Sequence, residues 1–122
     1  LCSLLGTPFC PDLSGAVLLV EDVGEFPYRL DRMLNQLRLA GVLDHLSGLV
    51  LGLFSNCFAP EEMDQSPTLE ELILDLTPPA LPVLAGFPYG HVPRRMVLPI
   101  GVNADLDTDG PSLVLVDSAL AP

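Results

Sequence analysis

Two short aliphatic runs with a helical pattern between them most constrain the fold of this chain. Residues 16–20 (Ala-Val-Leu-Leu-Val) and 49–54 (Leu-Val-Leu-Gly-Leu-Phe) are continuously apolar, which is typical of strands buried on both faces of a parallel sheet. The apolar spacing between them predicts a helix over residues 28–40, which Pro27 can start and Gly41 can end. This order predicts a right-handed crossover that joins two parallel strands.

A second helix and a third strand continue the alternation. Ser66 with Pro67, or Thr68 with Glu71, can cap the second helix, and residues 81–86 predict the third strand. The apolar face expected for this helix consists of Leu69, Leu72, Ile73 and Leu76.

The last quarter of the chain has a different pattern. Apolar residues alternate with period two over residues 96–106, a turn pattern follows at 107–111, and residues 113–116 form another aliphatic run, which together predict an antiparallel hairpin. We therefore expect an α/β fold of three layers. A parallel sheet would carry helices on one face and an antiparallel hairpin or half-barrel on the other.

Size and charge exclude several classes of protein. The 122 residues fit one domain, and 16 acidic residues against five basic ones give a formal net charge of −11. Such a field repels nucleic acid phosphates and anionic lipids, so we expect neither nucleic acid nor a membrane as a partner.

Three cysteines without close pairing, and no signal-peptide pattern, predict reduced thiols and a cytoplasmic location. Because the sequence starts on an apolar segment without Met, we expect a fragment of a longer protein.

Ionisable residues follow the predicted strands at their carboxyl ends. Glu21 follows the first strand, and His91 follows the third in a glycine-flanked turn. The carboxyl ends of parallel strands lie at one edge of the sheet, and ligands bind at that edge. A carboxylate beside an imidazole is two thirds of a hydrolytic triad, because the carboxylate orients the imidazole that takes the nucleophile's proton. The alternative is structural, with Glu21 capping the next helix and His91 as a surface or hydrogen-bonded structural residue.

The nucleophile of such a triad is not evident in this sequence. Ser55 follows the second strand but lies outside the Gly-x-Ser-x-Gly turn that exposes a catalytic hydroxyl. Cys57 together with His91 and Glu21 would make an internal thiol hydrolase, whereas a free cysteine after a buried strand is more often inert packing. The sequence leaves both interpretations open.

Three other patterns have ordinary explanations. Residues 105–110 (Asp-Leu-Asp-Thr-Asp-Gly) match the start of a calcium loop, but Val116 stands where a bidentate Glu is needed, so we expect a hairpin turn. His45 has no partner at metal-ligand spacing, and we expect no metal ion. Arg29 or Arg32 could bind a substrate carboxylate, and a solvated helix face explains them equally well.

Several motifs, taken in order, resemble one family of peptidases. They are Gly-Thr-Pro at 6–8, Val-Glu-Asp-Val-Gly-Glu at 20–25, Pro-Tyr-Arg-Leu-Asp-Arg-Met-Leu at 27–34, Gly-Phe-Pro-Tyr-Gly-His at 86–91 and Leu-Pro-Ile-Gly at 98–101. This set resembles the carboxy-terminal domain of the LD-carboxypeptidases, serine peptidases that include the microcin C7 self-immunity proteins. The resemblance covers nearly the whole chain.

The resemblance implies a two-domain enzyme with a Ser-Glu-His triad. The Ser would lie in an amino-terminal domain similar to class I glutamine amidotransferases and absent from this chain. Residues 1–122 would then be the carboxy-terminal domain, of swivelling β/β/α type, with residues 1–12 as the interdomain linker. By position the triad's Glu is Glu21, with Glu25 as the nearest competitor, and its His is His91. The chain alone is expected to be inactive.

The resemblance also implies a reaction and a substrate. The family removes terminal D-alanine from cytoplasmic murein tetrapeptides during peptidoglycan recycling, without a cofactor, and forms homodimers. One alternative is a microcin-immunity type of amidase that cleaves peptidyl or aminoacyl nucleotides. An alternative from another class is a stand-alone interaction module with no catalysis.

Overall fold

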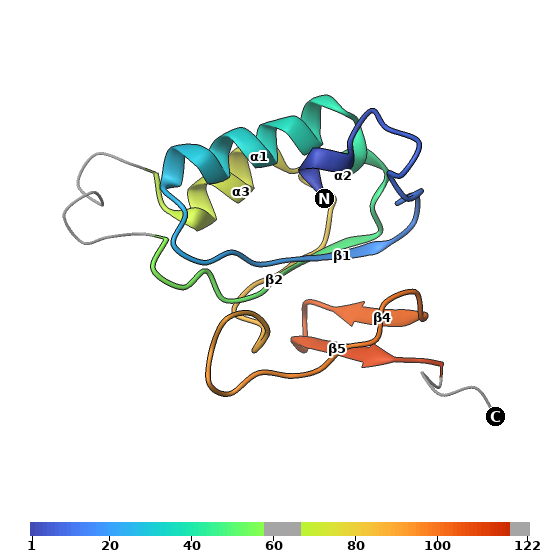
Figure 1. The fold of residues 1–122 in the computed structure, drawn as a ribbon. Coiled ribbons are helices and arrows are strands. Elements are labelled where there is room, and N and C mark those ends of the chain that lie inside the picture. Colours follow the sequence, from blue (N-terminus) through green and yellow to red (C-terminus); the bar gives the residue numbers. More distant parts are fainter. Residues whose placement is uncertain (58–66, 118–122) are drawn as a thin grey trace.

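The computed structural model of the protein describes residues 1–57 and 67–117, and Figure 1 shows the path of the chain. The elements in chain order are η1 (Cys2–Leu4), β1 (Val17–Val20), α1 (Pro27–Leu39), α2 (Val42–His45), β2 (Gly48–Leu51), α3 (Leu69–Leu76), β3 (Val83–Leu84), β4 (Ala104–Asp107) and β5 (Ser112–Leu115). Within the described residues, no helix is long and apolar enough to cross a membrane.

A parallel sheet of order β1-β2-β3 forms the middle of the molecule. Val17 is paired with Gly48 and Val20 with Leu51, and β2 pairs in parallel with β3 on its other side. All four residues of β2 are buried, as its continuous aliphatic sequence predicts for a central strand. The predicted crossover of parallel strands is confirmed.

Helices α1 and α3 cover one face of this sheet (Figure 1). Helix α1 begins with Pro27 in its first turn, and Gly41 follows it in the left-handed conformation, with φ of 73°. The hydrophobic core lies between these helices and the sheet. The buried residues of that core cluster are Leu34, Leu49, Leu51, Leu72 and Ile73.

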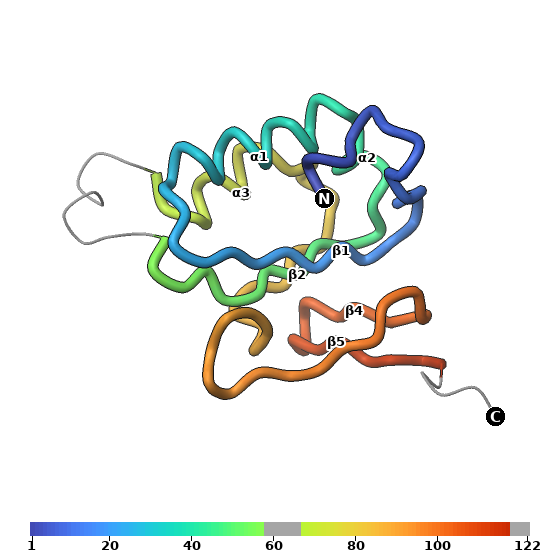
Figure 2. The backbone as a smooth tube through the Cα atoms, in the orientation of Figure 1, coloured from blue at the N-terminus to red at the C-terminus, as the bar shows by residue number. Residues whose placement is uncertain are grey.

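The antiparallel hairpin of β4 and β5 lies against the opposite face of the sheet (Figure 2). Its Leu106 packs where Gly48 of β2 has no side chain, because a Cβ built at Gly48 would lie 2.5 Å from Cδ2 of Leu106. The three-layer α/β architecture is therefore confirmed, with a two-stranded hairpin as the third layer.

Several strands are shorter than predicted. The second strand stops at Leu51 instead of residue 54, and the third spans only Val83–Leu84. The predicted strand arm over 96–106 is wrong for its first part, since β4 starts at Ala104. Pro99 has no N–H for a strand ladder, and Gly101 adopts a φ of 82°.

Two helical turns escaped prediction. These are α2, of four residues, and η1, of three. They are too short to show a helical periodicity. The side-chain amide Nε2 of Gln36 on α1 donates to the carbonyl of Cys2, so η1 packs against that helix.

The start of α3 is a capping box. The amide of Glu71 donates to the hydroxyl oxygen of Thr68 over 3.2 Å, and the amide of Thr68 donates to the Glu71 carboxylate over 2.7 Å. The pair of Thr68 and Glu71 is thus the cap, and Ser66, the other predicted cap, lies outside the described residues. The hydrogen bonds from Thr68 hold the pKa of the Glu71 carboxyl below its ordinary value.

This capping box makes the stability of the chain depend on pH. A lowered folded-state pKa stabilises the fold above the unfolded value of about 4.3, and the gain is lost as pH falls through the folded pKa. We expect Glu71→Gln to lower the free energy of unfolding near pH 7 and to have little effect at pH 2–3. Chemical denaturation at several pH values measures this. Glu70→Gln, in the same turn but outside the box, is the control, and an equal effect of Glu71→Gln at all pH values would contradict the assignment.

Candidate active site

Glu21 is the first residue after β1. The strand fixes its position, because Val20 still accepts a hydrogen bond of 2.8 Å from the amide of Gly52 at the end of β2. The Glu21 side chain is mostly buried, with 21% of its surface exposed. Its carboxylate therefore stands at the carboxyl edge of the sheet in a restricted space.

His91 reaches the same edge from a turn that follows β3. The amide of Phe87 donates to the carbonyl of Leu51 over 3.0 Å, and the amide of Leu53 donates to the carbonyl of Tyr89 over 2.8 Å. These bonds tie the turn to the end of β2. In Figure 2 the orange segment after β3 curls below the sheet at the end where β1 and β2 finish.

The two side chains meet. Nδ1 of His91 lies 2.9 Å from Oε2 of Glu21, and 65% of the His91 side chain is exposed. An ionised carboxylate can only accept, so this contact places the ring proton of a neutral imidazole on Nδ1. Nε2 is then unprotonated, and it has no hydrogen-bond partner in the described parts of the chain. A carboxylate, an oriented imidazole and an accessible Nε2 are the parts needed for general-base catalysis.

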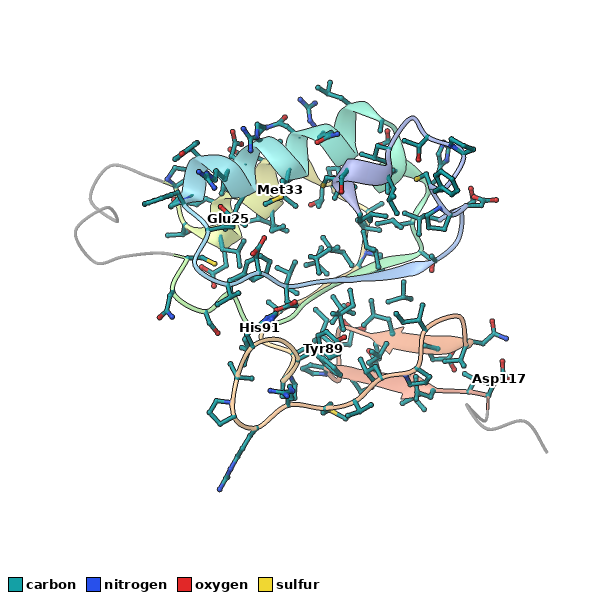
Figure 3. The ribbon with its side chains drawn as sticks, viewed as in Figure 1. Glu25, Met33, Tyr89, His91 and Asp117 are labelled. Atoms are coloured by element: carbon teal, nitrogen blue, oxygen red, sulfur yellow. The ribbon has the colours of Figure 1, made fainter. Side chains whose placement is uncertain are left out.

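The competing carboxylates at this edge have other partners. Glu25 forms an ion pair with Arg29 over 3.2 Å, one turn apart at the start of α1. Oδ1 of Asp22 accepts from the amide of Val23 over 2.7 Å. Figure 3 shows Glu25 beside α1 and apart from His91. Glu21 is thus the carboxylate in contact with the imidazole.

Ser55 and Cys57 follow β2, as predicted, but within the described residues neither forms a hydrogen bond with His91. Ser55 continues the parallel pairing through a bridge with Val23, and its amide donates to the carbonyl of Asp22. Cys57 is only 2% exposed, and its thiol donates to the carbonyl of Ser55 over 3.6 Å. Burial raises the pKa of the Cys57 thiol, which disfavours the thiolate that a nucleophile requires.

The remaining candidates have structural surroundings. Asp107 accepts at Oδ1 from the amides of Asp109 and Gly110, so the calcium-like motif forms the turn between β4 and β5. His45 is exposed at the end of α2. Residues 1–57 and 67–117 contain no group of three or more potential metal ligands. Arg29 is held by Glu25 and lies 5.9 Å from the ring centres of Phe26 and Tyr28.

Two glycines beside the pair were not predicted as part of the site. Gly52 lies where the chain after β2 passes Glu21, and Gly90 directly precedes His91. An isolated glycine in a strand pattern signals a close approach of another backbone, and the aliphatic run at 49–54 carried that signal at Gly52.

The comparison with known families decides the relationship of this chain. Residues 1–106 match the model of the LD-carboxypeptidase C-terminal domain. The chain belongs to this family. A putative carboxypeptidase of Synechocystis is 44% identical over 110 residues, which are 89% of this chain and 36% of that protein.

Two further relatives carry different names. The crystal structure of muramoyltetrapeptide carboxypeptidase from Oxalobacter formigenes matches with a TM-score of 0.78 and 36% identity, over 92% of this chain and 39% of that one. The microcin C7 self-immunity protein MccF of Escherichia coli is 28% identical over 125 residues, covering 99% of this chain and 35% of that protein. This LD-carboxypeptidase domain therefore spans well under half the length of each relative.

The surroundings of Cys57 lead to a prediction about its reactivity. We expect iodoacetamide at neutral pH to modify Cys57 more slowly than the half-buried Cys2 and Cys10, because the buried thiol keeps its proton. We also expect the same Cys57 rate in His91→Ala, because the Cys57 thiol donates to Ser55 and the His91 ring pairs with Glu21. Peptide mass mapping of the alkylated chain measures both rates. Fast labelling of Cys57 that depends on His91 would instead support the internal thiol hydrolase.

Proposed function

We propose that this domain supplies the Glu and the His of a Ser-Glu-His triad in a serine LD-carboxypeptidase. The observation that carries the proposal is the contact of 2.9 Å between Nδ1 of His91 and Oε2 of Glu21. The Ser would come from an amino-terminal domain, joined through a linker at residues 1–12. The exposure of His91 fits this arrangement, since Nε2 remains open to a hydroxyl from outside the domain.

In the proposed mechanism His91 moves one proton in each half of the reaction. The Ser Oγ attacks the carbonyl carbon between the L-centre of a diamino acid and terminal D-alanine, and its proton passes to Nε2. The imidazolium, stabilised by Glu21, returns this proton to the departing amine of D-alanine. Water then hydrolyses the acyl-enzyme with His91 again as the base. His91 returns the proton taken from water to the Ser Oγ, and Glu21 keeps the other ring proton on Nδ1 throughout.

The proposed substrate is a murein tetrapeptide, and the proposed process is peptidoglycan recycling in the cytoplasm. The Oxalobacter relative is named a muramoyltetrapeptide carboxypeptidase, which supports this substrate class. Cys2, Cys10 and Cys57 are free thiols, which fits a reducing compartment. The mechanism needs no cofactor. A homodimer is the expected assembly, and the net charge of −11 argues against a nucleic acid partner.

A second candidate is cleavage of a peptidyl or aminoacyl nucleotide, because MccF matches nearly the whole chain. The same pair would serve there, so the two functions differ in substrate recognition rather than in proton transfer. A competition assay with murein tetrapeptide and an aminoacyl sulfamoyl nucleoside separates them. Cleavage of the nucleoside alone, with no release of D-alanine from the tetrapeptide, would favour the second candidate.

The proposed roles predict a large loss of activity in the two-domain protein. We expect Glu21→Ala and His91→Ala each to reduce kcat/KM for D-alanine release by about 10²- to 10⁴-fold, the usual contribution of general acid–base catalysis. Glu70→Gln and His45→Ala remove the same residue types at exposed positions and serve as matched controls. Unfolding curves must show that all four variants fold.

The 122-residue chain provides the complementary test. Because the proposed nucleophile lies outside it, we expect no D-alanine release from this chain alone. Turnover by the isolated chain would place the nucleophile within it. Full activity of the folded Glu21→Ala or His91→Ala protein would contradict the triad.

A further inference from the structure

Three backbone segments converge where Glu21 meets His91. They are the end of β1, the residues that follow β2 and the turn that precedes His91. Figure 3 shows His91 and Tyr89 on that turn, below the sheet. Gly52 lies at the centre of this convergence. Its amide donates to Val20, while the next amide, that of Leu53, donates to Tyr89.

Gly52 leaves open a space that the site requires. A Cβ at this position would lie 2.8 Å from the carbonyl oxygen of Tyr89, 3.0 Å from Cβ of Glu21 and 3.3 Å from the carbonyl oxygen of Val20. Two of these neighbours are backbone atoms held by hydrogen bonds of 2.8 Å, so they cannot move away without breaking those bonds. The φ of Gly52 is not positive, and the need for glycine there is therefore steric.

Gly90 also leaves open a space beside the Glu21 carboxylate. A Cβ at this position would lie 2.9 Å from Oε2 of Glu21, the atom that accepts from His91, and 3.0 Å from the carbonyl oxygen of Leu53. Its φ of 126° is also one that a residue with a side chain rarely adopts. A methyl group would thus compete with the imidazole for the same carboxylate oxygen.

We infer that Gly52 and Gly90 are positioning residues, whose missing side chains allow the Glu21 carboxylate and the His91 turn to close on each other. The effect of these glycines on catalysis rests on the proposed function. Their effect on the hydrogen bond between His91 and Glu21 does not. Replacement of either glycine by Ala should separate Nδ1 from Oε2. The ring proton of His91 would then lose the acceptor that holds it on Nδ1.

Gly52→Ala has a matched control at Gly48, the first residue of β2. A Cβ at Gly48 also meets a close neighbour, but this neighbour is the end of the Leu106 side chain in the hairpin. That flexible side chain can rotate away from the added Cβ. Two-bond ¹H–¹⁵N correlation spectra of the His91 ring, recorded on the 122-residue chain, report the tautomer. We expect loss of the Nδ1–H form in Gly52→Ala and its retention in Gly48→Ala.

Gly90→Ala and Gly86→Ala form a second pair, because both glycines lie in the same turn with positive φ. Gly86, with φ of 72°, has no atom within 4 Å of its Cβ position. It therefore shares with Gly90 the backbone strain of a positive φ but not the close contacts. We expect loss of the Nδ1–H form in Gly90→Ala and its retention in Gly86→Ala. This pair decides the question if Gly52→Ala does not fold.

The outcomes are distinguishable from a failure of the proposed function. Retention of the Nδ1–H form in folded Gly52→Ala and Gly90→Ala overturns the inference, whatever the activity of the longer protein. Unfolding of both variants while the two controls fold also overturns it, since the glycines would then serve the fold and not the pair. Loss of the tautomer in the folded variants, with unchanged controls, supports it even if the substrate proves to be different.

Discussion

The hydrogen bond between Glu21 and His91 joins residues that are seventy positions apart in the chain. Every functional statement about the domain depends on it. It arises because β1 and β3 flank the same central strand in parallel, so the segments leaving them emerge at one edge. An isolated surface histidine does not describe this arrangement, although the ring is largely exposed.

The pair itself contributes little to stability. The His91 ring is largely exposed, and a polar contact to an exposed side chain is typically worth about 0–1 kcal/mol because the entropy of ordering that side chain opposes it. The geometry must therefore be imposed by the backbone. Val20, Gly52, Leu53 and Tyr89 provide this through two hydrogen bonds of 2.8 Å, and the buried β2 anchors them in the core. The site is thus prepared by the sheet before any partner hydroxyl arrives, which is the condition for efficient proton transfer.

Sequence patterns predicted the parallel sheet and the edge at which Glu21 and His91 meet. These predictions succeed because burial on both faces leaves a continuous aliphatic run and because parallel strands fix the side of the sheet at which each following segment emerges. The patterns failed on strand lengths, since alternation over 96–103 does not form a ladder around Pro99 and Gly101. They also left Cys57 open as a nucleophile, because its burial depends on residues distant in sequence.

The identity of the carboxylate partner is the point to measure directly. The ring of His91 in the 122-residue chain can be compared by ¹H–¹⁵N correlation spectra between Glu21→Ala and Glu25→Ala, at a pH where the imidazole is neutral. The account predicts that the proton leaves Nδ1 in Glu21→Ala and stays there in Glu25→Ala. A ring that responds to loss of Glu25 and ignores loss of Glu21 would contradict it.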